Sequence, residues 1–281
     1  MSRRERVAEV QRSLATRRPR PPAPGDVRLS LIIPAYREAD RIGSTIKRVR
    51  TELEPLVGDG ELEIVVVDDG SGDGTDLAAR GAEADTVVVQ PVNRGKGAAV
   101  RAGVQAASGR TVAFTDADLA YAPAQVHDLL LAVEDGWDVV VGSRAHPGTT
   151  TSAPASRLRS VGSRVINLAT RSVLLGDHAD TQCGLKAFRS DVARILFGRG
   201  LIDGFAFDIE LFAMVERFDL SLTELPVTLH NMDESTVRVG RDTVDLLADL
   251  GRIRWYARRG RYRLRPGEDD ALLPGDPPSG H

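Results

Sequence analysis

One cysteine, no long apolar run and almost no net charge are the first features of this sequence. The single Cys183 excludes an intramolecular disulfide framework and a metal site made of cysteines alone. No segment approaches the roughly 18 uninterrupted apolar residues of a membrane-spanning helix, and no apolar stretch typical of a secretory signal follows the first arginines. The 37 Lys and Arg residues nearly balance the 40 Asp and Glu residues, which disfavours a dedicated nucleic-acid binder. We therefore expect a cytoplasmic protein that touches a membrane only peripherally, on its cytoplasmic face.

Composition separates the two ends of the chain from its middle. Residues 1–28 combine many arginines with the stretch Pro21-Pro22-Ala23-Pro24-Gly25, and residues 265–281 are rich in proline and glycine. Neither composition can bury a core, so we expect a disordered basic arm and a disordered tail. The residues between them, 29–264, predict one domain with two halves, 29–145 and 146–264.

In the first half, short β-branched runs alternate with amphipathic stretches. The runs that predict strands are 29–33, 63–67, 86–89, 111–114 and 138–141. Apolar residues at helical spacing predict helices around 42–53, 95–107 and 126–133. Strands that are apolar on both sides and separated by helices indicate an α/β fold with a mostly parallel sheet covered on both faces. Ligands of such sheets bind at the carboxyl ends of the strands.

Polar segments follow three of the predicted strands. They are Pro34-Ala35-Tyr36-Arg37-Glu38, Asp68-Asp69-Gly70-Ser71 and Asp116-Ala117-Asp118. Carboxylates accept hydrogen bonds from a nucleobase or from ribose hydroxyls, and two carboxylates one residue apart can hold Mg²⁺ or Mn²⁺. Each motif alone also fits a simple turn, because Asp and Gly favour turns. Their succession along one sheet edge favours a nucleotide and metal site.

These motifs, in this order, resemble those of family 2 glycosyltransferases, whose domain has the GT-A nucleotide-sugar fold. The first segment matches the family's P-A-Y-N-E pattern with Arg37 in place of Asn, and Asn93-Arg94-Gly95-Lys96-Gly97 matches its N-x-G-K-G turn, although a glycine-rich helix start explains that segment as well. The resemblance implies Mg²⁺ or Mn²⁺ as the cofactor, with Asp116 and Asp118 as metal ligands. It implies donor binding by Pro34, Ala35, Tyr36, Glu38, Asp68, Asp69, Lys96, Asp116 and Ala117.

Three segments of the second half extend the resemblance to one branch of the family. They are Val141-Gly142-Ser143-Arg144-Ala145-His146, the run 180–188 (D-T-Q-C-G-L-K-A-F) and Phe205-Ala206-Phe207-Asp208-Ile209-Glu210. They are most similar to dolichyl-phosphate β-glucosyltransferases, which implies inverting transfer of glucose from UDP-glucose to a polyprenyl phosphate. GDP-mannose as donor, a cytosolic enzyme with a soluble acceptor, and a nucleotide-sugar-binding pseudoenzyme remain as alternatives.

An acceptor phosphate needs cations, and guanidinium groups bind its oxygens in pairs. Arg144 is the strongest candidate because it directly follows a predicted strand, and Gln182 and Lys186 are further candidate acceptor contacts. The better interpretation of Arg157, Arg159 and Arg164 is a solvated basic face.

Asp118, Asp208 and Arg144 are the predicted catalytic residues. Because a phosphate acceptor is already anionic at pH 7, Asp208 or Glu210 is expected to orient the acceptor, or to act as a base only if the acceptor is a hydroxyl.

The segment Asp242–Arg259 predicts a helix with apolar residues, two aromatic residues and clustered arginines. This composition fits a helix that lies at an anionic membrane surface and makes the expected peripheral membrane contact. A membrane protein is the alternative partner for this helix. A core-packing helix with a solvated end fits the composition equally.

Overall fold

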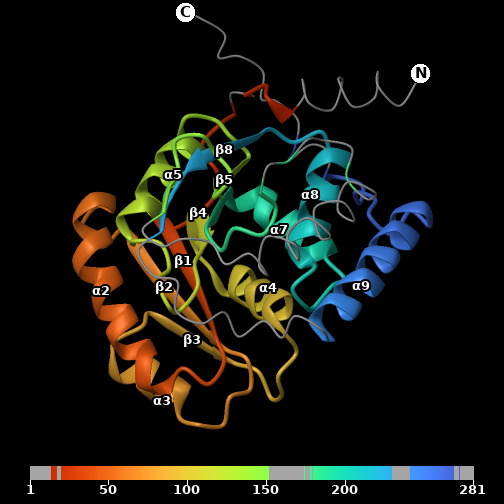
Figure 1. Cartoon of the computed structure of the whole chain (residues 1–281). Helices are drawn as coiled ribbons and strands as arrows, with labels where there is room; N and C mark the ends of the chain where they lie inside the picture. Colours follow the sequence, from red (N-terminus) through yellow and green to blue (C-terminus); the bar gives the residue numbers. More distant parts are fainter. Residues whose placement is uncertain are drawn as a thin grey trace, which may run out of the picture.

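A seven-stranded sheet forms the centre of the protein (Figure 1). The computed structural model describes residues 14–17, 20–151, 174, 178, 180–229, 241–268 and 272. The strand order is β3-β2-β1-β4-β7-β5-β8, and only β7 runs antiparallel to its neighbours. The strands of this sheet are β1 (Val27–Ala35), β2 (Leu62–Asp68), β3 (Thr86–Val89), β4 (Gly109–Phe114), β5 (Val139–Ser143), β7 (Lys186–Arg189) and β8 (Leu222–Pro226). The short strands β6 (Thr150–Thr151) and β9 (Thr228–Leu229) form a separate parallel pair.

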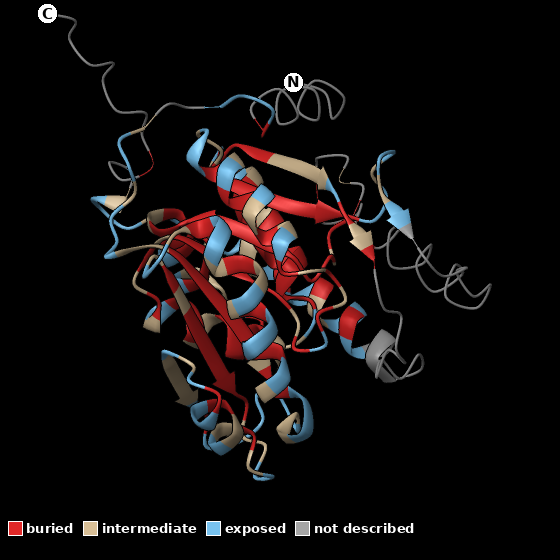
Figure 2. Ribbon diagram, turned by 90° about the vertical axis from the view of Figure 1, so that its left-hand side faces the viewer, coloured by how far each residue is buried: buried red, intermediate tan, exposed pale blue. Residues whose placement is uncertain are grey.

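Helices cover both faces of this sheet. Successive residues of each strand point to opposite sides, and because the residues on both sides are apolar, both faces have to be covered. Leu31 and Ile33 of β1 join one buried cluster, while Ile32 between them joins the other. The first cluster lies under α2 (Ala39–Val57), α3 (Thr75–Gly81) and α5 (Ala124–Glu134). The second lies under α4 (Lys96–Ala106), α7 (Ser190–Arg199), α8 (Phe207–Arg217) and α9 (Arg241–Arg258). Figure 2 shows the buried strands between helices whose outer faces are exposed.

The predicted α/β fold with a mostly parallel sheet is confirmed, and each predicted strand of the first half is present. Among the elements that the sequence analysis did not locate, β7 matters most, because it inserts between β4 and β5. Phe188 of β7 lies opposite Val112 and Val139, so this one strand joins the two halves of the domain. Its four residues are all buried, including Lys186 and Arg189, and this charged composition hides it from a search for apolar alternation.

Residues 20–25, at the end of the predicted arm 1–28, pack against the domain. The guanidinium of Arg20 pairs with Asp138 at 2.9 Å, and both side chains are nearly inaccessible to solvent. Ser190 Oγ donates to the carbonyl of Pro24 at 2.6 Å, and Gly25 lies so close to the backbone of Gly109 that a side chain would not fit. A buried guanidinium needs such an acidic partner, which the sequence alone did not reveal. Residues 1–13 lie outside the described residues.

The C-terminal helix α9 packs into the core through one face, which carries the buried residues Leu246, Leu250 and Ile253. The core-packing interpretation is therefore confirmed for this face. Leu247, which lies beside this face, and Trp255, on the opposite side of the helix, are exposed to solvent. Within the described part of the chain, no helix has the length and apolar character needed to cross a membrane.

Candidate active site

The three predicted polar segments converge at one edge of the sheet, where β1, β2 and β4 end. Ala35 lies beside Asp68 in the strand register, and the backbone N–H of Asp69 donates to the carbonyl of Ala35 at 2.9 Å. Thr45 of α2 donates through Oγ1 to the carbonyl of Ala117 at 2.7 Å. This hydrogen bond connects the helix to the segment Asp116-Ala117-Asp118, called the D-A-D turn below. The carboxyl ends of neighbouring parallel strands thus bring together segments that are far apart in the sequence.

Asp69 holds the turn that precedes α4. The backbone N–H groups of Arg94 and Gly95 donate to its Oδ1 at 2.9 Å and its Oδ2 at 2.8 Å. Burial raises the pKa of Asp69, although these two hydrogen bonds oppose the shift. Gly70, which has a positive φ of 72°, lies against the backbone of Asn93, where a side chain would not fit. Asp69 thus fixes this turn, with each of its carboxylate oxygens accepting one backbone N–H group.

The first turn of α4 is held on its other side by residues 202–207. A Cβ on Gly97 would lie 2.6 Å from Cβ of Phe207, and the N–H of Ala98 donates to the carbonyl of Asp203 at 3.2 Å. The carboxylate of Asp203 also pairs with Arg101 of α4 at 2.6 Å. The backbone on both sides of Lys96 is therefore fixed.

Lys96 and Asp116 form an ion pair between Nζ and Oδ1. The other oxygen of Asp116, Oδ2, lies against Gly184, and any side chain at Gly184 would overlap it. Burial acts to lower the pKa of Lys96, but the carboxylates of Asp116, Asp208 and Asp118 outweigh it and raise the pKa. Lys96 is therefore positively charged and lies near the carboxylates of these three predicted site residues.

A second ion pair, between Lys186 and Asp208, is buried beside the first. Lys186 Nζ lies 2.7 Å from Asp208 Oδ1, donates to the carbonyl of Cys183 at 2.6 Å and lies 5.5 Å from the ring centroid of Phe114. Burial raises the pKa of Asp208, while Lys186 and Lys96 act to lower it. The predicted acceptor contact Lys186 is therefore the counter-ion of the predicted catalytic Asp208, and the side chain of Cys183 is buried as expected of a small hydrophobe.

Arg144 is held by Asp180, to which no role was assigned from sequence. Arg144 Nε lies 2.6 Å from Oδ2 of Asp180, and Nη2 lies 2.8 Å from Oδ1. The side chain of Arg144 is 45% exposed, so the pair presents a cation to solvent in a defined orientation. The backbone N–H of Gln182 donates to the same carboxylate at 3.2 Å. The signal that would have revealed Asp180 is its place in the D-T-Q-C-G block. Arg157, Arg159 and Arg164 lie outside the described residues.

The remaining predicted donor residues line the same edge with different exposure. Tyr36 is exposed, whereas Asp68 is buried and accepts the backbone N–H of Ser71 at 2.9 Å. Burial raises the pKa of Glu38, Arg41 lowers it and the nearby carboxylate of Asp118 raises it further. Glu38 and Asp118 are therefore close enough to interact. Pro34 and Ala35 lie at the end of β1.

Glu210 is not available as a base, although the sequence offered it as an alternative to Asp208. It is fully buried and accepts the backbone N–H groups of Leu201 at 2.8 Å and Ile202 at 3.0 Å. Its Oε1 also accepts the hydroxyl of Tyr262, which follows α9, at 2.7 Å. Glu210 thus links the C-terminal part of the domain to the loop that supports α4.

The donor set at this edge fits a hard divalent cation. Over the described parts of the chain, no group of three or more His, Cys, Asp and Glu side chains gathers as a metal site. Asp116 and Asp118 nevertheless offer carboxylate oxygens, and the ammonium of Lys96 on Asp116 shows that this position attracts a cation. Mg²⁺ commonly binds through one or two carboxylates and completes its shell with substrate phosphates and water.

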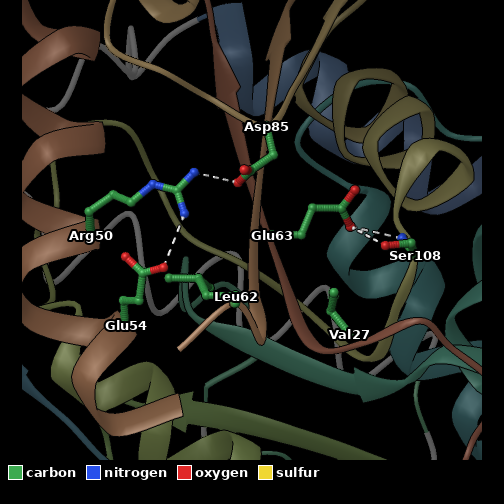
Figure 3. Close-up of a pocket in the computed structure, with 8 residues that line it drawn as sticks. Val27, Arg50, Glu54, Leu62, Glu63, Asp85 and Ser108 are labelled. Carbon is green, nitrogen blue, oxygen red and sulfur yellow. Dashed lines mark hydrogen bonds and ion pairs between the residues drawn. The ribbon is translucent and has the colours of Figure 1, made fainter. Parts of the chain in front are cut away.

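A hollow elsewhere on the molecule, shown in Figure 3, is a different feature. It lies near the amino ends of β1 and β2 and includes Glu63 and Asp85 in its lining. Arg50 pairs with Asp85 at 2.7 Å, and Glu63 accepts the backbone N–H of Ser108 at 2.8 Å. Its charges are satisfied by the protein itself, and it lies at the sheet edge opposite to the predicted site.

The fold and the polar sheet edge define a glycosyltransferase of the GT-A type. Residues 30–197 match the family model described as glycosyl transferase family 2, and the chain belongs to this family. It is 34% identical to a dolichyl-phosphate beta-glucosyltransferase of Drosophila melanogaster, over 76% of this chain and 72% of that protein. It is 30% identical to the enzyme of the same name from Saccharomyces cerevisiae, over 85% and 77%.

Solved structures agree with the fold. The chain resembles a glucosyl-3-phosphoglycerate synthase of Mycobacterium tuberculosis, crystallised with Mn²⁺, UDP and glucosyl-3-phosphoglycerate, with a TM-score of 0.58 and 23% identity over 91% of this chain and 83% of that one. A second crystal structure, of a mycobacterial protein, gives a TM-score of 0.61 and 25% identity over 87% of this chain and 77% of that one.

Replacing Gly184 with alanine should place a methyl group on the carboxylate of Asp116 and push it away from Lys96. Because small misplacements of reacting groups cost roughly a hundredfold in rate, we expect glycosyl transfer to fall by about that factor. Gly198→Ala is the matched control, since a Cβ at Gly198 meets nothing within 4 Å. Transfer rates and thermal unfolding of both variants are the measurements. Equal rates for the two variants would contradict this account of Gly184.

Proposed function

We propose that this chain transfers glucose from UDP-glucose to a polyprenyl phosphate, with inversion at the anomeric carbon. The observation that carries the proposal is the meeting of two sets of charged residues at one sheet edge. The D-A-D turn and Lys96 supply the donor side, and the Arg144–Asp180 pair from the second half of the domain supplies an oriented cation for an acceptor phosphate. The similarity to dolichyl-phosphate beta-glucosyltransferases supports this choice of sugar and acceptor.

On the donor side, negative charge grows on the diphosphate as the bond to the sugar breaks. A divalent cation, held by Asp116 and Asp118, would supply the positive charge that stabilises this leaving group. Lys96 is positioned to add its own charge, because Asp69 and Asp203 fix the backbone on either side of it. Preorganised charges of this kind act where charge develops and need no rearrangement during the reaction.

On the acceptor side, a phosphate oxygen attacks the anomeric carbon, and the bond from that carbon to the diphosphate breaks. The products are the glycosylated polyprenyl phosphate and UDP. The nucleophile carries its negative charge at pH 7, so no proton has to be removed from it. Arg144 orients the acceptor phosphate, and the buried Lys186–Asp208 pair shapes the wall next to it.

We further propose that α9 contacts an anionic membrane surface, where a polyprenyl phosphate would be presented. Leu247, Trp255 and Arg258 fall at steps of eight and three residues on the solvent-exposed face of this helix. The guanidinium of Arg259 lies 4.5 Å from the ring centroid of Trp255. Aromatic and apolar residues next to arginines are typical of helices that lie at a membrane interface. The arginines of residues 1–13 lie outside the described residues.

UDP-glucose with Mn²⁺ should raise the thermal unfolding temperature more than GDP-mannose with Mn²⁺. A ligand that binds only the folded state stabilises it, and at equal concentration the ligand that binds more tightly stabilises it more. The gain is about 2.7 kcal/mol at a concentration a hundred times the dissociation constant. Transfer to a short polyprenyl phosphate should be detected in extracted lipid, and the matched polyprenol without phosphate is the control acceptor. Equal or greater stabilisation by GDP-mannose would refute the donor, and turnover that is insensitive to EDTA would refute the metal.

Asp118→Asn should reduce turnover at least a thousandfold, because the substitution keeps the size of the side chain but removes the charge that holds the cation; each tenfold corresponds to about 1.4 kcal/mol. Asp208→Asn should cost much less, since a phosphate acceptor needs no base, whereas a true base contributes roughly a hundredfold to ten-thousandfold. Both variants are assayed with the polyprenyl phosphate acceptor. Circular dichroism and donor binding serve as controls for folding. If a folded, donor-binding Asp208→Asn enzyme is as inactive as Asp118→Asn, the base-free mechanism is wrong.

Arg258→Gln should weaken binding to vesicles that contain anionic lipid roughly fivefold, because each cation near such a surface contributes about 1 kcal/mol. Lys47→Gln is the matched control, since it removes one exposed charge from α2 instead. Sedimentation with vesicles at low and high salt measures the binding. Raising the salt should release the protein, because charges are screened within about 10 Å at 0.1 M. Binding that resists salt, or equal binding by the two variants, would refute this surface.

A further inference from the structure

The ion pair between Lys96 and Asp116 engages one of the two carboxylates that are expected to hold the metal. Lys96 Nζ contacts Oδ1 of Asp116, while Oδ2 of the same carboxylate is confined by Gly184. A divalent cation that binds Asp116 through Oδ1 therefore has to compete with an ammonium group of the protein itself.

The charges around this pair make the competition strong. Asp116, Asp118 and Asp208 contribute three negative charges, and Lys96 and Lys186 contribute two positive charges, so their sum is −1. Lys186 is already committed to Asp208 at 2.7 Å and to the carbonyl of Cys183 at 2.6 Å. Without Lys96, one more unit of negative charge would be left for a divalent cation at Asp116 and Asp118. With Lys96 in place, the ammonium and a divalent cation would meet at the same carboxylate oxygen, and the repulsion between the two positive charges disfavours metal binding.

The backbone on both sides of Lys96 is held by hydrogen bonds and close packing. The N–H groups of Arg94 and Gly95 are held by Asp69 on one side, and Gly97 and Ala98 are held against residues 202–207 on the other. The Lys96 ammonium stands on a flexible four-carbon stem, and its side chain is 18% exposed. The part of this segment that is able to move is thus the side chain that carries the charge.

We propose that Lys96 is an exchangeable counter-ion: it neutralises Asp116 when no metal is present, and yields this carboxylate to the divalent cation as it moves to the diphosphate of the donor. This inference rests on the proposed function, because it takes a nucleoside diphosphate as the group that receives the lysine. Metal and nucleotide would then bind cooperatively. The metal alone binds weakly, and the diphosphate draws Lys96 away from Asp116 and so opens the metal position. Each ligand raises the affinity for the other by the same factor.

The test is a titration of the full chain with Mn²⁺ alone and with Mn²⁺ plus UDP, followed by the electron paramagnetic resonance signal of free Mn²⁺. Lys96→Met should bind Mn²⁺ alone at least about tenfold more tightly than the unmodified protein, since an opposite charge at this range changes the affinity of a carboxylate for a proton by roughly one to three powers of ten. UDP should tighten Mn²⁺ binding strongly in the unmodified protein and less in Lys96→Met.

Two variants serve as controls. Lys96→Arg keeps the positive charge and should bind Mn²⁺ alone as weakly as the unmodified protein. Lys47→Met removes one exposed positive charge from α2 and should also behave as the unmodified protein does. If Lys96→Met does not fold, Lys96→Gln replaces it, because it also removes the charge but can still donate a hydrogen bond to Asp116.

Mn²⁺ binding to Lys96→Met that is no tighter than to the unmodified protein would overturn the proposal. Mn²⁺ binding to neither protein, even with UDP, would overturn it together with the metal role. Tighter Mn²⁺ binding to Lys96→Met, with no UDP binding to any variant, would support the competition between lysine and metal and refute the proposed donor.

Discussion

Balance of charge in one small space at the carboxyl edge of the sheet is the constraint on which this site depends. Asp116, Asp118 and Asp208 would repel one another if they stood alone, and Asp208, which is buried, is tolerated as a charge only when it is paired. Lys96 and Lys186 each pair with one of these carboxylates and leave a modest negative excess. This excess is what a cation or a cationic group meets when it enters the site.

The remainder of the domain keeps the paired charges in place. Asp69 ties the turn before α4 to the end of β2, and Glu210 ties the loop after α7 to the buried hydroxyl of Tyr262. Both carboxylates hold the backbone around Lys96 through the segments they bind. A buried carboxylate that accepts several hydrogen bonds is rigid because losing any one of them leaves a polar group unsatisfied.

The two halves of the domain contribute different chemistry and are joined by β7. The first half ends its parallel strands in carboxylates, and the second half adds Arg144 with its partner Asp180. Because β7 lies between β4 and β5, Lys186 at its start is brought beside Phe114 at the end of β4. An antiparallel strand inserted in a parallel sheet thus places a lysine of the second half within the site of the first.

The sequence by itself determined the α/β class, the position of each strand in the first half and the three motifs at the strand ends. This was possible because apolar runs and helical spacing are local, and the carboxyl ends of parallel strands lie at one edge by geometry alone. Only the tertiary structure decided which charges pair. The pairings depend on contacts between residues that are far apart in the chain. Asp69 holds the turn before α4, and Lys186 is the counter-ion of Asp208. Glu210 accepts backbone N–H groups inside the domain, and Arg20 is buried against Asp138. Such pairings follow from how the layers pack, for which a single sequence carries no local signal.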